Sequence, residues 1–131
     1  MFIVVAALIK KDNKILLGRR ASGDALSYDK WEFPGGKKDY DEDEFIAVER
    51  EIEEEFNTKV KAIKYIDKVV YKYPKKIVDL RLYECEYISG EFDLIDHSEI
   101  SWVAFEDIKN YDLCPADRAL YDKLVSKGYK V

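Results

Sequence analysis

The chain has one histidine, His97, and two cysteines, Cys85 and Cys114, among 131 residues. A single histidine excludes a zinc site built on two imidazoles. Any serine or cysteine nucleophile would have to use His97 as its base. The cysteines lack the close, paired spacing of a metal site or a disulfide framework, so we expect free thiols and a cytoplasmic protein. These scarcities argue against zinc chemistry and against nucleophilic catalysis.

Long apolar runs are also absent. The most apolar stretch covers residues 2–9, eight residues in all, whereas a membrane span needs about 20. No basic residue precedes it, so it does not have the form of a signal peptide. We interpret it as a buried strand and expect no membrane association.

Positive charge is not in excess. The 22 basic and 27 acidic residues give a net charge of -5, whereas a surface that binds nucleic acid is usually basic. Lysines and tyrosines do alternate over residues 59–76, a pattern that can bind RNA. Lysines that face solvent from the strands explain the same pattern more simply. We therefore expect no nucleic-acid polymer as a partner.

Repeats and low-complexity segments are missing, and 47% of the residues are hydrophobic. This favours one folded domain over residues 1–131, as a monomer or a homodimer. Periodicity and turn residues predict strands at 2–10, 14–17, 31–33, 60–73, 77–88 and 100–105. They predict helices from Asp41 or Asp43 to Phe56, and from Pro115 to a point before Gly128. Such an order indicates an α/β domain with a mixed sheet.

What the chain does have is acid, concentrated in the stretch EREIEEE at residues 49–55. A run of like charge is usually a solvated helix face. Here Glu51, Glu54 and Glu55 fall within one arc of about 100° and repel one another at about 0.2–0.5 kcal/mol per pair. They also lie near the helix end that disfavours anions. Because these glutamates repel one another and oppose the helix dipole, we expect a bound cation to compensate them. Carboxylates without histidine or thiol suit Mg²⁺ or Mn²⁺.

The acidic helix is part of a longer pattern, G-x5-E-x7-R-E-I-x-E-E. Its members are Gly36, Glu42, Arg50, Glu51, Ile52, Glu54 and Glu55. This pattern resembles the Nudix box. The segments LLGRR (16–20), WEFPGGK (31–37), DHSEISWV (96–103) and LCPAD (113–117) are similar to the MutT-type branch, above all to bacterial CTP pyrophosphohydrolases. Asn57 and Thr58 depart from the pattern, which usually has glycine and an aliphatic residue there, and asparagine is the next-best residue for that helix end.

The resemblance implies an α/β/α sandwich with a mixed sheet. It also implies hydrolysis of a nucleoside triphosphate to the monophosphate and pyrophosphate, with Mg²⁺ or Mn²⁺ as cofactor. The implied metal ligands are the carboxylates of Glu51, Glu54 and Glu55 and the backbone carbonyl of Gly35. Arg50 would orient a glutamate, and Glu42 would support the loop.

The general base, or a further metal ligand, usually comes in this branch from a glutamate before the His-x4-Trp strand. Here that position holds Asp96, which is one methylene shorter. Glu99 is the second candidate. Either residue could also be an ordinary loop acid.

The resemblance also suggests substrate contacts. Arg20 and Lys76 would hold phosphates, and Asp117 would contact the base. An ionised aspartate only accepts hydrogen bonds, so Asp117 would favour bases with amino or imino donors, as in CTP, dCTP, or dGTP and its oxidised form. The alternative is that Asp117 only stabilises the start of the last helix.

Two other functions stay open. The first is a nucleotide- or metal-binding module with the Nudix fold and little turnover, which the shortened Asp96 favours. The second is an ADP-ribose-type pyrophosphatase, because Pro74 stands at a distance from the box that also occurs in those enzymes. The intact set of Glu51, Glu54 and Glu55 favours the triphosphate hydrolase.

Overall fold

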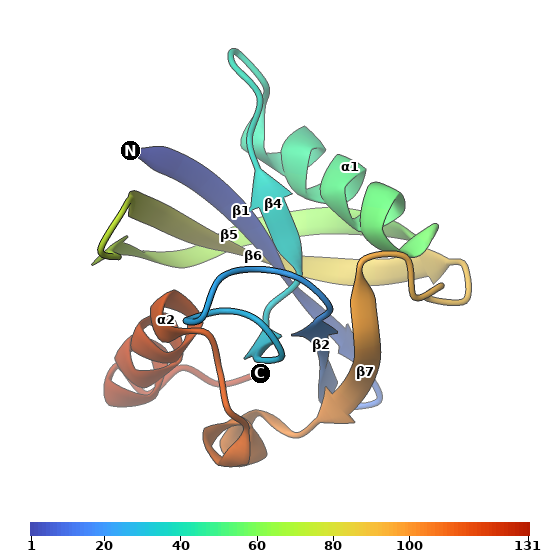
Figure 1. The fold of residues 1–131 in the computed structure, drawn as a ribbon. Coiled ribbons are helices and arrows are strands. Elements are labelled where there is room, and N and C mark those ends of the chain that lie inside the picture. Colours follow the sequence, from blue (N-terminus) through green and yellow to red (C-terminus); the bar gives the residue numbers. More distant parts are fainter.

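A seven-stranded mixed sheet forms the middle of the molecule in the computed structural model, which describes residues 1–131 (Figure 1). Its main path runs β3-β2-β1-β6-β5, while β4 pairs with β1 and β7 pairs with β2. Strands β1 and β6 are parallel, and the other strand pairs are antiparallel. The strands are β1 (Phe2–Lys11), β2 (Lys14–Arg20), β3 (Trp31–Glu32), β4 (Gly35–Lys37), β5 (Lys59–Lys72), β6 (Ile77–Ser89) and β7 (His97–Val103).

Strand β1 separates two hydrophobic cores. Its side chains alternate between the two faces of the sheet, as the period of a strand requires. Ala6 and Leu8 belong to the core under helix α2 (Pro115–Ser126). Val5, Ala7 and Ile9 belong to the core under helix α1 (Glu44–Phe56). The two helices therefore cover opposite faces of the sheet (Figure 1), which confirms the expected α/β/α sandwich with a mixed sheet.

Helix α1 begins and ends as its sequence predicts. The side chain of Asp43 caps the start by accepting a hydrogen bond from the Ile46 amide at 3.2 Å. Asn57 ends the helix in the left-handed conformation, with a φ of 54°, which asparagine tolerates better than most residues. Val48, Ile52 and Phe56 are buried against the sheet. Among the acidic side chains of α1, only Glu55 is buried with these residues.

Three elements differ from the prediction. Strand β2 continues to Arg20, past the predicted end at residue 17, and β7 begins at His97 rather than Ile100 and ends at Val103. A 3-10 helix follows β7 at Phe105–Asn110. Strand β4, at Gly35–Lys37, was not predicted. These strands depend on pairing with distant segments, because β2 pairs with β7 and β4 with β1. Gly35 permits that pairing, since a Cβ there would lie 1.9 Å from the Val5 carbonyl oxygen.

Strands β5 and β6 form a long hairpin, and β5 is the outer strand of the sheet. The register of this pair shifts at three places along β5. At the tip, the Tyr73 amide donates to the Lys76 carbonyl at 2.8 Å across Pro74 and Lys75. No helix in the chain has the length and hydropathy that crossing a membrane requires.

Candidate active site

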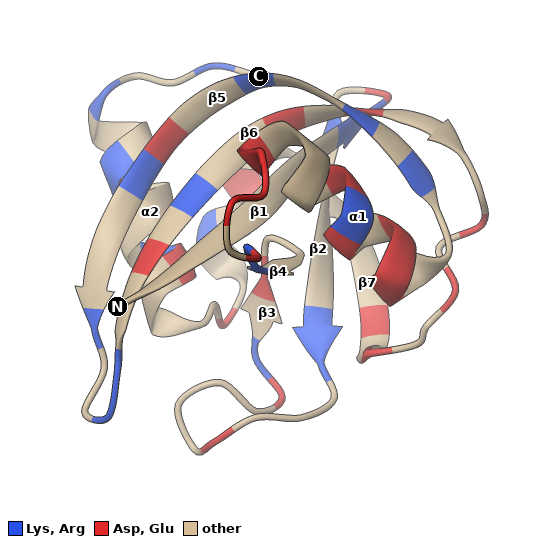
Figure 2. Ribbon diagram, turned by 90° about the horizontal axis from the view of Figure 1, so that it is seen from above, with Lys and Arg blue, Asp and Glu red and all other residues tan.

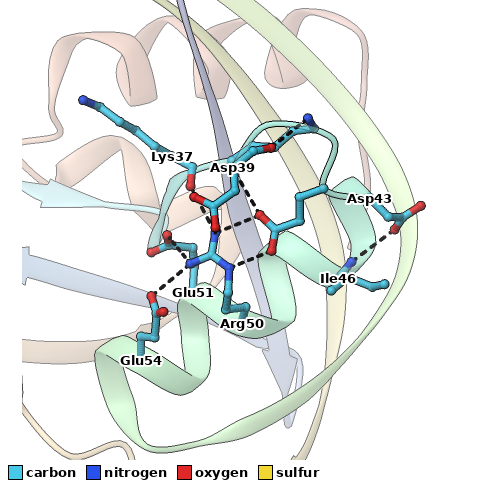
Figure 3. A network of polar contacts seen from close by, with 9 residues as sticks. Lys37, Asp39, Asp43, Ile46, Arg50, Glu51 and Glu54 are labelled. Atoms are coloured by element: carbon cyan, nitrogen blue, oxygen red, sulfur yellow. Dashed lines mark hydrogen bonds and ion pairs between the residues drawn. The ribbon is translucent and has the colours of Figure 1, made fainter.

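Arg50 joins the loop before α1 to the acidic face of that helix (Figure 3). Its Nε and Nη2 donate to the two carboxylate oxygens of Glu42, at 2.7 Å and 2.9 Å. Nη2 also donates to the Lys37 carbonyl at 3.2 Å, and Glu42 accepts a hydrogen bond from the Asp39 amide at 3.0 Å. The hydrogen bonds from Arg50 lower the pKa of Glu42 to about 2. This double contact fixes the loop on the helix.

The third nitrogen of Arg50 reaches two more glutamates. Its Nη1 donates to Glu51 and to Glu54, at 3.0 Å in both cases. One cation therefore relieves part of the repulsion that the sequence indicated. Figure 2 shows α1 with basic colour next to acidic colour. Glu51 also lies against β4, because a Cβ on Gly36 would be 2.2 Å from Glu51 Oε2. Glycine at position 36 thus makes room for this carboxylate.

Glu55 has no such partner. It is only 8% exposed, and its Oε1 is buried without a hydrogen bond. Burial, followed by the negative charges of Glu32, Glu51 and Asp96, raises its pKa to about 9. A buried carboxyl surrounded by acids needs either a proton or a bound cation. The oxygen donors at this end of α1 fit a hard divalent cation such as Mg²⁺ or Mn²⁺.

The carboxylates do not converge on one point. No three acidic, histidine or cysteine side chains stand at metal-binding spacing. Arg50 contacts both Glu51 and Glu54, but the Glu54 side chain is 59% exposed, that of Glu51 is only 14% exposed, and Glu55 is buried. The structure therefore brings Glu51, Glu54 and Glu55 to one helix end, where Glu51 and Glu54 share Arg50 and Glu55 has no partner.

Glu32 is a site residue that the sequence reasoning missed. Its two oxygens contact Arg20 Nη1 at 3.1 Å and His97 Nε2 at 2.9 Å. His97 stacks on Phe56 at the end of α1, with ring centroids 4.9 Å apart, and Gly18 leaves room for its ring. The available signal was an acid inside the short apolar segment 31–33. Glu32 connects Arg20 to the end of the acidic helix.

The two candidates for the general base have different surroundings. Both side chains are exposed. Glu99 forms an ion pair with Arg19 at 3.1 Å. Asp96 lies close enough to Glu55 for its charge to raise the pKa of that residue. Asp96 is therefore the candidate nearer to the acidic helix, and Glu99 is held by an arginine.

A cavity of about 210 Å³ opens beside these residues. Hydrophobic side chains of β1 and β6 form part of its wall, and the other lining residues include Arg20, Glu32, Phe33, Gly35, Gly36, Tyr73, Lys76, Cys114 and Asp117. The cavity thus brings together the three residues expected to contact substrate, which come from three separate segments of the chain. Its position next to Gly35 and Gly36 joins it to the acidic end of α1.

Asp117 differs from its expected state. Its carboxylate is buried and accepts a hydrogen bond from the Phe33 amide at 3.0 Å. Burial, followed by the charge of Glu32, raises its pKa well above the ordinary value. The ionised form assumed from the sequence is therefore disfavoured, and a protonated carboxyl can donate as well as accept.

Known proteins share this architecture. The family model of the NUDIX domain matches residues 2–124. The CTP pyrophosphohydrolase of Escherichia coli (strain K12) is 32% identical over 96% of this chain and 93% of its own. The 8-oxo-dGTP diphosphatase of the same strain is 30% identical over 93% of this chain and 94% of its own. The crystal structure of the MutT protein from Methanosarcina mazei Go1 superposes with a TM-score of 0.85 at 28% identity. The superposition covers 98% of this chain and 96% of that protein.

The chain therefore belongs to the Nudix family, as the box at residues 36–55 indicated. Its relatives and structural neighbours are of the MutT type. It is a MutT-type hydrolase that acts on phosphorus-containing acid anhydrides, with nucleotides as substrates and a divalent metal as the cofactor typical of the family.

Proposed function

We propose that the protein is a Mg²⁺- or Mn²⁺-dependent nucleoside triphosphate pyrophosphohydrolase that releases a nucleoside monophosphate and pyrophosphate. The observation that carries the proposal is the buried, unpartnered Oε1 of Glu55 at the helix end beside a cavity lined by Arg20 and Lys76. A buried carboxyl without an ion-pair partner, next to cations that can hold phosphates, is the arrangement that a metal-bound polyphosphate requires.

The metal would be held by the carboxylates of Glu51, Glu54 and Glu55 and the carbonyl of Gly35, with the carboxylate of Asp96 as the alternative further ligand if it is not the base. When bound, it would neutralise phosphate charge and make a water more acidic. Arg50 keeps its double contact with Glu42 and thereby orients the helix end.

The substrate side of the site is proposed from the cavity. Arg20, which Glu32 holds at 3.1 Å, and Lys76 would bind phosphate oxygens. Asp96 would accept the proton of the attacking water, since Glu99 is paired with Arg19. Asp117, which lines the same cavity, would contact the base.

The names of two relatives support two classes of base. One relative is named for CTP and another for 8-oxo-dGTP. We therefore propose CTP or dCTP, or dGTP and its oxidised form, as the preferred substrates. The free, buried thiols of Cys85 and Cys114 support a cytoplasmic location.

The decisive experiment is to incubate the pure protein with Mg²⁺ and a nucleotide panel, and to measure pyrophosphate release. We expect pyrophosphate from at least one triphosphate, and at least about 100-fold slower release from the Glu55→Gln variant. Binding of triphosphates without turnover by the parent would instead support a nucleotide-binding module, which the short side chain of Asp96 favours. Cleavage of ADP-ribose in preference to every triphosphate would also contradict the proposal.

A further inference from the structure

Tyr73 follows β5 at the tip of the hairpin and lines the cavity beside Asp117 and Cys114. Its ring is half-buried, packs against Tyr71 with centroids 4.8 Å apart, and has Lys76 Nζ at 5.6 Å. The amide of Tyr73 is hydrogen-bonded to the Lys76 carbonyl across the hairpin. Tyr71 and Lys76 therefore contact the ring, and the hairpin hydrogen bond fixes the backbone of Tyr73.

The hydroxyl oxygen of Tyr73 already has one partner. It accepts a hydrogen bond from the Ala116 amide at 3.0 Å. Ala116 lies in the first turn of α2, where Cys114 at the N-cap provides no side-chain hydrogen bond. Tyr73 thus supplies the cap that the sequence before α2 lacks.

The proton of this hydroxyl is free to be donated. A phenol has one O–H donor in addition to its acceptor lone pairs. Burial raises the pKa of Tyr73 to about 12, so the group keeps its proton at neutral pH. The Ala116 amide occupies an acceptor position of the oxygen, which leaves the O–H bond to point elsewhere. Tyr73, its partner Ala116 and Asp117 all line the cavity.

We propose that Tyr73 determines specificity by donating its hydroxyl hydrogen to an acceptor atom on the edge of the nucleobase. This proposal rests on the proposed function in assuming that the occupant of the cavity is a nucleotide. Asp117 is the next residue after Ala116, and one of its oxygens is fixed by the Phe33 amide. The donor of Tyr73 and the carboxyl of Asp117 therefore approach the cavity together.

The substrate class follows from this pair. The donor selects a base with a carbonyl oxygen or an unprotonated ring nitrogen on the edge that enters the cavity. Cytosine offers such acceptors, and so does the O6 edge of guanine. A phosphorylated sugar without a base offers none, and its binding would depend on Arg20 and Lys76 alone.

The test compares Tyr73→Phe with Tyr71→Phe, which removes a hydroxyl from the neighbouring ring. Chemical-shift titrations would measure the dissociation constants of CMP, 8-oxo-dGMP and ribose 5-phosphate without turnover. For Tyr73→Phe, we expect about a 3- to 10-fold weaker affinity for the preferred nucleoside monophosphate, as for one lost hydrogen bond. Ribose 5-phosphate should bind unchanged, and Tyr71→Phe should bind all three ligands like the parent.

The capping role gives a second readout. Tyr73→Phe should lower the melting temperature, because Ala116 loses its partner. An unchanged amide shift of Asp117 in the ligand-free variant would show that a change in base preference does not come from displacement of Asp117. Equal weakening for ribose 5-phosphate and the nucleotides, or unchanged affinity for all, would overturn the inference. The parent protein could bind nucleotides without hydrolysing any, while Tyr73→Phe loses the base preference of the parent. That outcome would support the inference and refute the proposed activity, so the two can fail separately.

Discussion

Arg50 and Glu42 are joined by two hydrogen bonds of 2.7 Å and 2.9 Å between the acidic helix and the loop before it. The guanidinium is planar and matches both oxygens of the carboxylate, which a lysine cannot do. The same arginine also contacts Glu51 and Glu54. The shape of the loop and the position of two proposed metal ligands therefore depend on one side chain.

Arg50→Lys should damage both stability and activity. The variant keeps the charge but loses the paired contact, so we expect the free energy of unfolding to fall by about 1–3 kcal/mol. Turnover should fall at least about 10-fold, since Glu51 and Glu54 lose their orientation. Thermal unfolding and pyrophosphate release would measure the two effects. Arg19→Lys is the matched control, because Arg19 forms its ion pairs at the surface, with Asp29 and Glu99. If both variants had the stability and turnover of the parent, this role for Arg50 would be refuted.

Glu55→Gln should reduce turnover by at least about 100-fold while stabilising the metal-free protein. The pKa of Glu55 is raised from 4.5 to about 9 in the folded state. Above pH 4.5 the unfolded chain gains from ionisation that the folded chain resists, so the parent loses stability as pH rises toward about 9. The advantage of the variant should thus grow from pH 5 to pH 8.

Melting temperatures in the presence of a chelator would measure this difference. Glu53→Gln, on the same helix but outside the proposed ligand set, serves as the control. If Glu55→Gln destabilised the protein more at pH 8 than at pH 5, burial of the Glu55 carboxyl would not lower the stability of the parent at high pH.

Asp96→Asn should lower turnover far more than Glu99→Gln. A general base must ionise and must reach the attacking water, and Asp96 is the acid whose charge acts on Glu55. Glu99 is bound to Arg19 instead. Steady-state rates with Mg²⁺ would compare the two variants. The opposite order would transfer the role to Glu99, and two small effects would mean that neither is the base.

Asp117→Ala should change which base is preferred. Loss of a base contact costs about 1–3 kcal/mol, so kcat/KM for the preferred triphosphate should fall by about 5- to 150-fold, and for the others much less. CTP, dCTP, UTP, dTTP, GTP and oxidised dGTP would be compared on parent and variant. If the ratio of kcat/KM for CTP to that for UTP stays the same and only the melting temperature changes, Asp117 only stabilises the start of α2.

The sequence predicted the features that depend on neighbouring residues. The cap at Asp43, the left-handed Asn57 and the apolar face of α1 all follow from local spacing. Glu32 could not be found in this way, because its partners Arg20 and His97 lie on other strands. The raised pKa of Asp117 was missed for the same reason, since burial and the charge of Glu32 arise only when distant segments pack together.

The three register shifts along β5 have a consequence for the molecule in solution. An outer strand with free backbone groups can extend its sheet into that of a second molecule. Bulges bend and twist such a strand so that a straight partner cannot pair along its length. β5 is interrupted at Lys59/Val60, Ala62/Lys64 and Tyr65/Asp67. The irregular edge therefore protects this protein against edge-to-edge aggregation, even though the strand is 14 residues long.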